Sequence, residues 1–290
     1  MWAAALAFTL WGFFPLYFRL EPGIVPAEVL ANRIVWALLL VTGVLTWQSR
    51  WSWLAPALRS RRVMASFVAS ALLLSANWMT YIWAVSNGHV VEASLGYFIT
   101  PLVNVALGFF LLGERPRRAQ WIALAIAAAG VVWLTASAGR LPWIGLVLGL
   151  SFGAYGLLRK VATLGALEGL TLETMILAPA AVAAMAWWWG GSATSFPAPT
   201  LATNVWLVGL GPATTAPLLL FALAARRLPM TTLGLVQYLS PTIQFLLGIW
   251  LFHEPFSATR LVGFVLIWTA LALYSLDGWR RRGLAVVPEP

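Results

Sequence analysis

Long apolar stretches separated by short polar segments fill nearly the whole chain, and this pattern predicts a helical membrane protein. A helix needs roughly 20 mostly apolar residues to cross a hydrocarbon core of about 30 Å. Breaker-rich segments such as "GERPRR" at 113–118 and "GGSATSFPAP" at 190–199 separate the stretches. We therefore expect an all-α integral membrane protein with ten transmembrane helices. The expected spans are residues 2–18, 29–47, 63–85, 91–112, 119–137, 142–158, 170–189, 203–225, 231–252 and 259–276.

Two of these stretches carry the same unusual pattern. The segment "GYFITPLVNVALGFFLLGER" at 96–115 matches "VQYLSPTIQFLLGIWLFHEP" at 236–255. Because five spans per half is an odd number, equivalent segments must cross the membrane in opposite directions. We therefore expect two inverted-topology five-helix repeats around a central cavity, an architecture typical of secondary transporters. The first repeat would cover 1–137 and the second 142–276, with a cytoplasmic tail at 277–290.

Composition agrees with the bilayer as the solvent of this chain. Apolar residues make up 61% of the 290 residues and charged residues only 9%, against about 45–50% and about 25% in soluble domains. Eighteen tryptophans suit the membrane–water boundary. With no cysteine, disulfides and thiolate chemistry are excluded. The sequence shows no phosphate-binding glycine loop and no metal-ligand cluster, so we expect no cofactor and no metal.

The net charge of +9 raises the possibility of nucleic acid as a partner, but the placement of the charges favours another interpretation. Basic residues concentrate in every second loop, as the positive-inside rule requires of cytoplasmic loops. This predicts cytoplasmic N- and C-termini, and no nucleic-acid partner. The presumed inside set is Arg50, Arg59, Arg61, Arg62, Arg115, Arg117, Arg118, Arg159, Lys160, Arg226, Arg227, Arg280, Arg281 and Arg282, and the outside set is Arg19, Arg33, Arg140 and Arg260.

Prolines and amides recur on one face of the two matching spans. Tyr97, Pro101 and Asn104 lie on one face of the fourth span because they are spaced by four and three residues. Their equivalents in the ninth span are Gln237, Pro241 and Gln244. Proline frees a backbone carbonyl, and a bare amide in hydrocarbon costs several kcal/mol, so both need protein or a watery cavity beside them. One interpretation is a cavity; the other is that the amides only bond between helices.

The third span adds Asn77 and Tyr81 on one face, with Trp78 beside them. The first and sixth spans are short and interrupted by Pro15 and Gly156, which is a sequence pointer to a transporter's site. We expect spans one, three, four, six, eight and nine to wall the cavity. The candidate solute-binding residues are Trp11, Asn77, Trp78, Tyr81, Tyr97, Asn104, Tyr155, Phe221, Gln237 and Gln244, and the candidate hinge residues are Pro15, Pro101, Gly156 and Pro241.

Charged residues are missing from the middle third of every expected span. Glu28, Arg33 and Glu173 lie near the starts of spans. Because ion-coupled transporters place ionisable side chains inside the membrane, this pattern favours facilitated flux of neutral, zwitterionic or amphipathic solutes. A cation could be held by the aromatic rings.

The segment "GLSFG" at 149–153 matches the pattern of serine hydrolases. It falls within an expected apolar helix, and both histidines, His89 and His253, lie at distant span ends. Gly145, Gly149 and Gly153 instead form a spacing typical of close helix packing. We therefore do not expect an enzyme.

Four segments resemble a known family. They are "EASLGYFITPLVNVALGFFLLGER" at 92–115, "NWMTYIWAV" at 77–85, "ANRIVW" at 31–36 and "TLETMILAP" at 171–179. They are similar to the RarD branch of the EamA group in the drug/metabolite transporter superfamily. The resemblance covers nearly the whole chain. It implies ten helices in two inverted repeats, and export of small metabolites or drugs through the bacterial inner membrane; members of the YddG type export aromatic and other amino acids.

Two alternatives stay open. A carrier of sugar derivatives or nucleotide sugars would need cationic residues along the cavity to meet phosphate. A helical scaffold or receptor would show no flux. The expected partners are a small-molecule substrate and the lipid bilayer, with a monomer as the simplest assembly.

Overall fold

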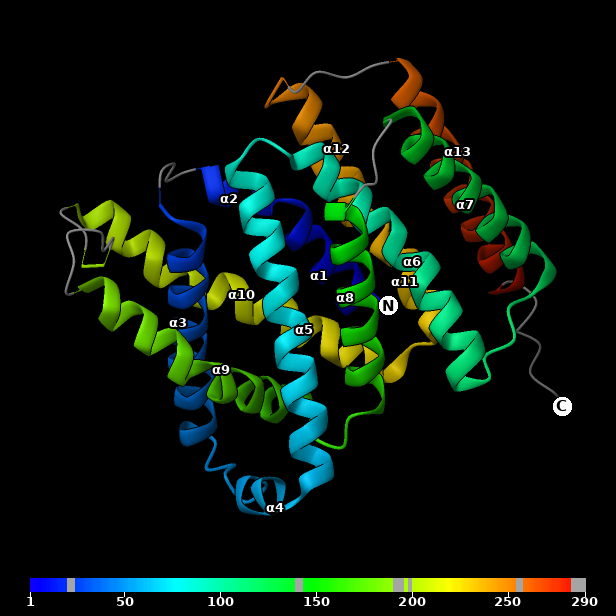
Figure 1. Ribbon diagram of the computed structural model, residues 1–290. Helices are drawn as coiled ribbons and strands as arrows, with labels where there is room; N and C mark the ends of the chain where they lie inside the picture. Colours follow the sequence, from blue (N-terminus) through cyan, green and yellow to red (C-terminus); the bar gives the residue numbers. More distant parts are fainter. Residues whose placement is uncertain (20–23, 139–142, 190–195, 198–199, 254–257, 283–290) are drawn as a thin grey trace, which may run out of the picture.

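The computed structural model describes residues 1–19, 24–138, 143–189, 196–197, 200–253 and 258–282. Within them the regular structure is helical throughout (Figure 1). Helices of the first half are α1 (Trp2–Gly12), α2 (Phe14–Arg19), α3 (Pro26–Trp47), α4 (Leu54–Arg59), α5 (Arg61–Ser86), α6 (Val90–Leu112) and α7 (Arg118–Ala138). Those of the second half are α8 (Trp143–Val161), α9 (Ala166–Trp189), α10 (Leu201–Arg227), α11 (Met230–Gln237), α12 (Leu239–Trp250) and α13 (Ala258–Arg282).

Among the described residues, eight helical segments are long and apolar enough to cross a membrane, and two shorter apolar ones lie at Trp2–Phe18 and Leu261–Ala270. Each of the ten expected spans is thus helical, while their number as complete crossings stays a prediction. One expectation needs correction. The sixth span is neither short nor interrupted, because α8 runs for 19 residues. The expected tail begins within α13, which continues to Arg282, and its cytoplasmic location stays a prediction.

Local sequence explains where several helices begin and end. Pro26 opens α3 at a position that needs no amide hydrogen. The Ser60 hydroxyl accepts a bond from the Val63 amide and caps α5. Gly113 has a positive φ of 67° and ends α6, while the Glu114 amide donates to the Gly108 carbonyl at 2.9 Å. Such a left-handed terminus favours glycine.

Helix pairs that pack together have counterparts made by the equivalent helices of the opposite halves. The pair α6 and α8 has its counterpart in α1 packed on α11 and α12, and the pair α5 and α8 has its counterpart in α10 and α1. The pair α3 and α10 likewise corresponds to α9 and α5, while α7 packs on its own equivalent α13 (Figure 1). This pattern is what a twofold relation between halves requires. The opposite sense of the halves in the membrane remains a prediction.

Glycines allow the closest helix contacts. A Cβ atom on Gly96 of α6 would lie 2.8 Å from the Gly145 Cα of α8, and one on Gly149 would lie 3.1 Å from the Gly96 carbonyl oxygen. The glycine spacing in α8 is therefore a packing face, as expected. Gly130 of α7 approaches the Gly263 carbonyl of α13 in the same manner.

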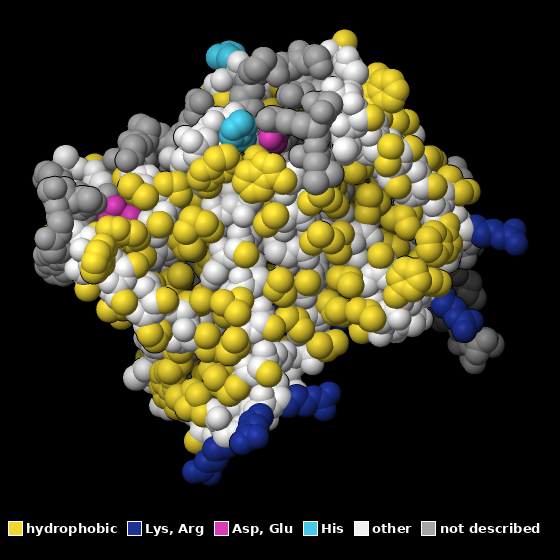
Figure 2. Space-filling model, viewed as in Figure 1, with side chains coloured by type: hydrophobic (Ala, Val, Ile, Leu, Met, Phe, Trp, Pro, Cys, Tyr) yellow, Lys and Arg dark blue, Asp and Glu magenta, His cyan; other side chains and the backbone are white. Residues whose placement is uncertain are grey.

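Exposed side chains follow the expected membrane geometry. Apolar side chains cover the middle of the face seen in Figure 2, whereas lysines and arginines lie at its lower end and at its right edge, and the histidines lie at its upper end. Exposed Arg59, Arg61 and Arg62 lie at the end formed by α4 and the start of α5. Which end faces the cytoplasm stays a prediction. Arg140 and Glu254 lie outside the described residues, as do 283–290 of the tail.

Candidate functional site

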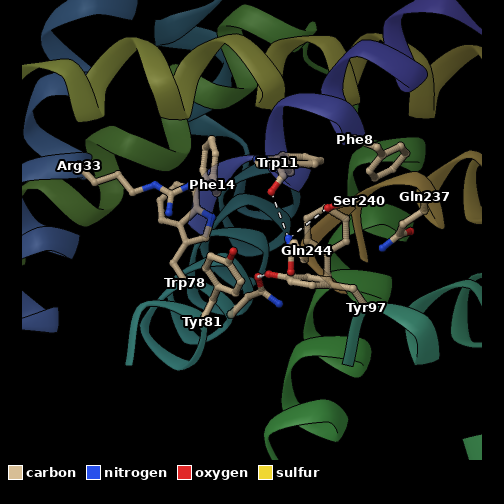
Figure 3. Close-up of a pocket in the computed structure, with 12 residues that line it drawn as sticks. Phe8, Trp11, Phe14, Arg33, Trp78, Tyr81, Tyr97, Gln237, Ser240 and Gln244 are labelled. Carbon is tan, nitrogen blue, oxygen red and sulfur yellow. Dashed lines mark hydrogen bonds between the residues drawn. The ribbon is translucent and has the colours of Figure 1, made fainter. Parts of the chain in front are cut away.

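A pocket lies where helices of both halves meet (Figure 3). Its walls come from α1, α2, α3, α5 and α6 of the first half and from α8, α11 and α12 of the second. The centres of water-sized molecules can occupy a volume of ≈ 30 Å³ inside it, which is room for about two waters. A larger solute would need the walls to separate. The lining residues are Phe8, Trp11, Phe14, Arg33, Asn77, Trp78, Tyr81, Tyr97, Phe152, Gln237, Ser240 and Gln244.

Seven of the ten candidate binding residues line this pocket: Trp11, Asn77, Trp78, Tyr81, Tyr97, Gln237 and Gln244. Tyr155 and Phe221 lie behind the wall, with their rings stacked at 5.9 Å and 19°. Phe221 also packs on Phe152 at 5.0 Å and on Trp11 at 5.7 Å. The expected wall was therefore partly wrong: α10, the eighth span, supports the pocket from behind, and α3, the second span, contributes to its lining.

Asn104 does not line the pocket but acts between helices. Its amide nitrogen donates to the Gln237 Oε1 at 3.0 Å, joining α6 to α11, and both side chains are buried. Of the two interpretations that the sequence allowed for the amides, Asn104 fits the bond between helices. Asn104 thereby orients Gln237, whose side chain does line the pocket.

Asn77 joins three helices at the pocket. Its amide nitrogen donates to the Leu148 carbonyl and to the Ser151 Oγ, both at 3.0 Å, while its Oδ1 accepts from the Tyr97 hydroxyl at 3.4 Å. Ser151, the serine of the hydrolase-like motif, is thus bonded to an amide, and no histidine lines the described pocket. The arrangement is one of helix packing.

Gln244 holds α12 against α1. Its amide nitrogen donates to the Trp11 carbonyl at 3.1 Å and to the Ser240 Oγ at 3.2 Å (Figure 3). Because a carbonyl can only accept, these bonds determine which end of the amide faces Trp11. The other end, Oε1, is buried without a hydrogen-bond partner. The pocket therefore contains an available acceptor among aromatic rings.

Arg33 overturns the expectation that charge is absent from the pocket. It lies seven residues inside α3, about 10 Å along the helix axis from Pro26, and only 2% of the residue is exposed. Its side chain turns inward and lines the pocket. The sequence predicts an outside segment for Arg33 because the residue comes near the start of the expected span 29–47, whereas α3 begins earlier, at Pro26.

A second charged group is buried beside the pocket wall. Arg159 of α8 lies 3.6 Å from the Glu173 carboxylate of α9, with both side chains 1% exposed. Glu173 also accepts from the Ser70 hydroxyl at 2.7 Å and the Tyr155 hydroxyl at 3.4 Å. Arg159 lies within α8, whereas the sequence predicts a cytoplasmic loop at this position. Breaking such a pair typically costs about 3–5 kcal/mol, so a structural role accounts for it.

The candidate hinge positions differ among themselves. Pro15 lies in α2, directly after the chain departs from α1 at Phe13. Pro241 lies in the first turn of α12, after the break at Tyr238 between α11 and α12. Pro101 instead lies within the continuous helix α6, and Gly156 within the continuous helix α8. The first and ninth spans are thus each broken, whereas their equivalents in the other half, the sixth and fourth spans, are continuous helices. Hinge motion itself stays a prediction.

Comparisons with known proteins agree with this architecture. Residues 1–136 match the model of the EamA-like transporter family. An uncharacterized transporter of Pseudomonas aeruginosa is 44% identical over 98% of this chain and 95% of its own length. Protein RarD of Streptomyces exfoliatus is 42% identical over 94% of this chain and 87% of its own, and protein RarD of Escherichia coli 39% identical over 94% and 93%.

A solved crystal structure, 20% identical, covers 96% of both chains with a TM-score of 0.68, which shows a shared fold. The family model and the named relatives make this chain a protein of the membrane-transporter class. The chain belongs to the RarD branch of the EamA-like transporter family, within the drug/metabolite transporter superfamily.

Proposed function

We propose that the protein exports small zwitterionic or amphipathic metabolites, amino acids with aromatic side chains among them, across the bacterial inner membrane. The observation that carries this proposal is the pocket itself, which both halves of the chain build and which combines aromatic rings with a few polar groups. Halves related by symmetry can exchange conformations and open the site first to one side and then to the other. The two helix breaks beside the pocket support such a motion.

The chemistry of the walls supports a zwitterionic solute. Rings of Trp11, Trp78 and Tyr97 offer apolar faces, and Gln244 Oε1 offers an acceptor for an ammonium group. Tryptophan faces also attract cations. No acidic side chain lines the described pocket, so it holds no carboxylate of the kind that couples transport to protons or cations. We infer facilitated flux as the mode of transport.

A carrier of phosphorylated sugars or nucleotide sugars is the second candidate, and Arg33 is the observation that favours it. One guanidinium meets one acidic group well, but a diphosphate calls for further cations, and none other lines the described pocket. A single carboxylate therefore fits better. The chloramphenicol-sensitive protein RarD of Pseudomonas aeruginosa, 32% identical, carries a drug in its name, and we extend the proposal to drugs of amphipathic character.

Flux into proteoliposomes tests the proposal. Purified protein should equilibrate radiolabelled amino acids across the bilayer faster than protein-free liposomes do. Accumulation above the outside concentration under a pH or Na⁺ gradient would refute facilitated flux. Absence of flux for amino acids, sugar phosphates and drugs alike would favour a scaffold or receptor. A C-terminal reporter tests the expected cytoplasmic termini.

A further inference from the structure

Arg33 is held at the pocket by contacts that leave part of its guanidinium unused. Its Nε donates to the Thr214 hydroxyl of α10 at 2.6 Å. Its Cζ lies 4.2 Å from the centre of the Trp78 ring and 5.4 Å from that of Phe14. Its Nη1 is buried without a hydrogen-bond partner. The side chain is therefore fixed in position while one donor nitrogen, Nη1, stays free.

No anion accompanies this cation in the described structure. Arg159, the other deeply buried arginine, has Glu173 beside it, but none of the ion pairs among the described residues includes Arg33. No aspartate or glutamate lines the pocket in the described residues either. An unpaired cation inside a membrane protein is costly and marks a functional site by default. The charge that would complete the site has to enter with a ligand.

A second donor lies at the same pocket. The Tyr81 hydroxyl is buried without a hydrogen-bond partner. In Figure 3, Arg33, Trp78 and Tyr81 lie on one side of the pocket, and Gln237 and Gln244 lie towards the other. A carboxylate attached to an apolar group needs hydrogen-bond donors for its oxygens and an apolar surface for the rest. This side of the pocket offers both.

We propose that the Arg33 guanidinium, with the Tyr81 hydroxyl, binds the carboxylate of the transported solute, whose apolar part rests against Trp78 and Phe14. The inference rests on the proposed function and adds that an acidic group is required for recognition. A planar carboxylate can accept from guanidinium donors in a charge-assisted bond, which an uncharged amide cannot replace. Solutes lacking the acid would leave the buried cation uncompensated.

Three probes that share one aromatic ring test the requirement in wild-type proteoliposomes. They are L-phenylalanine, 3-phenylpropanoate, which lacks the amine, and L-phenylalaninamide, which has an amide in place of the acid. We expect both acids to be transported and the amide to be transported about ten- to a hundredfold less well, the range of a hydrogen bond to a charged group. Glucose 6-phosphate serves as a phosphate-bearing probe.

Arg33→Gln should abolish this discrimination, and Arg33→Lys should keep part of it because it retains the charge. Arg62→Gln, an exposed arginine at the start of α5, is the matched control and should transport like wild type. Size-exclusion profiles and melting temperatures establish that the variants are folded. If Arg33→Gln does not fold, the wild-type comparison of acid with amide still decides.

The outcomes separate this inference from the proposed function. Equal transport of phenylalanine and phenylalaninamide by wild type, or unchanged discrimination in folded Arg33→Gln, overturns the inference and leaves the transport proposal in place. Preferred transport of glucose 6-phosphate assigns the guanidinium to phosphate and overturns it as well. Flux of none of the probes refutes the proposed function itself.

Discussion

The hydrogen bond between Asn104 and Gln237 allows a quantitative test of how the pocket is held. Asn104→Leu removes the donor but keeps a side chain branched at the same carbon. The 3.0 Å bond is lost, and the Gln237 Oε1, which is already buried, is left without this donor. Replacing Gln237 by methionine removes the acceptor instead and leaves an unbranched side chain that fills the same space.

Two magnitudes bound the expected effect. A buried acceptor left unsatisfied costs about 1–3 kcal/mol in soluble proteins. Interhelical hydrogen bonds in membrane proteins average about 0.6 kcal/mol, with a maximum of about 1.7, because the unfolded state in a bilayer or micelle also offers partners. We therefore expect Asn104→Leu to lower the free energy of unfolding by about 1 kcal/mol. The double variant should recover part of this loss, because no polar group is then left unpaired.

A double-mutant cycle measures the effect. The free energy of unfolding of wild type, both single variants and the double variant is obtained from sodium dodecyl sulfate titrations in mixed micelles, followed by far-ultraviolet circular dichroism. We expect a coupling energy of about 0.6–1.7 kcal/mol. Additive effects, within the about 0.3–0.5 kcal/mol expected of independent sites, would mean that the bond does not hold α6 to α11. The same variants should also shift solute preference in the flux assay, since Gln237 lines the pocket.

Further predictions follow from the same geometry. Pro101→Ala and Pro241→Ala should lower turnover more than stability if the proline-bearing segments move; equal losses of both would argue against hinges. Asn77→Ala and Tyr81→Ala should alter solute preference, and unchanged uptake profiles would exclude these residues from the binding site. Gly149→Leu should destabilise the protein by about 1–3 kcal/mol, because a Cβ there would already lie 3.1 Å from the Gly96 carbonyl oxygen; Gly43→Leu, which meets open space, is the control, and equal melting temperatures would refute the packing argument. A reporter fused after the last residue should be active in the cytoplasm, and periplasmic activity would contradict the expected orientation.

The pattern of apolar stretches anticipated every long helix because membrane spans follow a simple rule. Each span must satisfy its own backbone hydrogen bonds and match the thickness of the hydrocarbon core. For α3, α5 and α9 the expected and observed ends agree to within four residues. The glycine spacing of α8 also correctly predicted a close-packing face, since only glycine permits the contact with Gly96.

Side-chain direction was harder to infer. In a soluble helix the polar face points to water, so periodicity identifies the buried face. In α3 that signal is absent, since lipid and protein interior both accept apolar residues. Ala37 and Val41 are buried on the same face as Arg33, while Leu39 and Leu40 are exposed. All four are apolar, so the sequence does not tell the buried face from the exposed one. Arg33 therefore looked like a residue at a span end.

The sequence by itself determined the helices, the duplicated pattern and the family, because these depend on length, composition and local spacing. Tertiary structure alone decided that Asn104 bonds to Gln237 across helices, that Phe221 supports the pocket from behind, and that Arg33 enters it. These roles depend on how helices are rotated about their own axes. In a bilayer, packing between helices sets that rotation, and hydropathy carries no record of it.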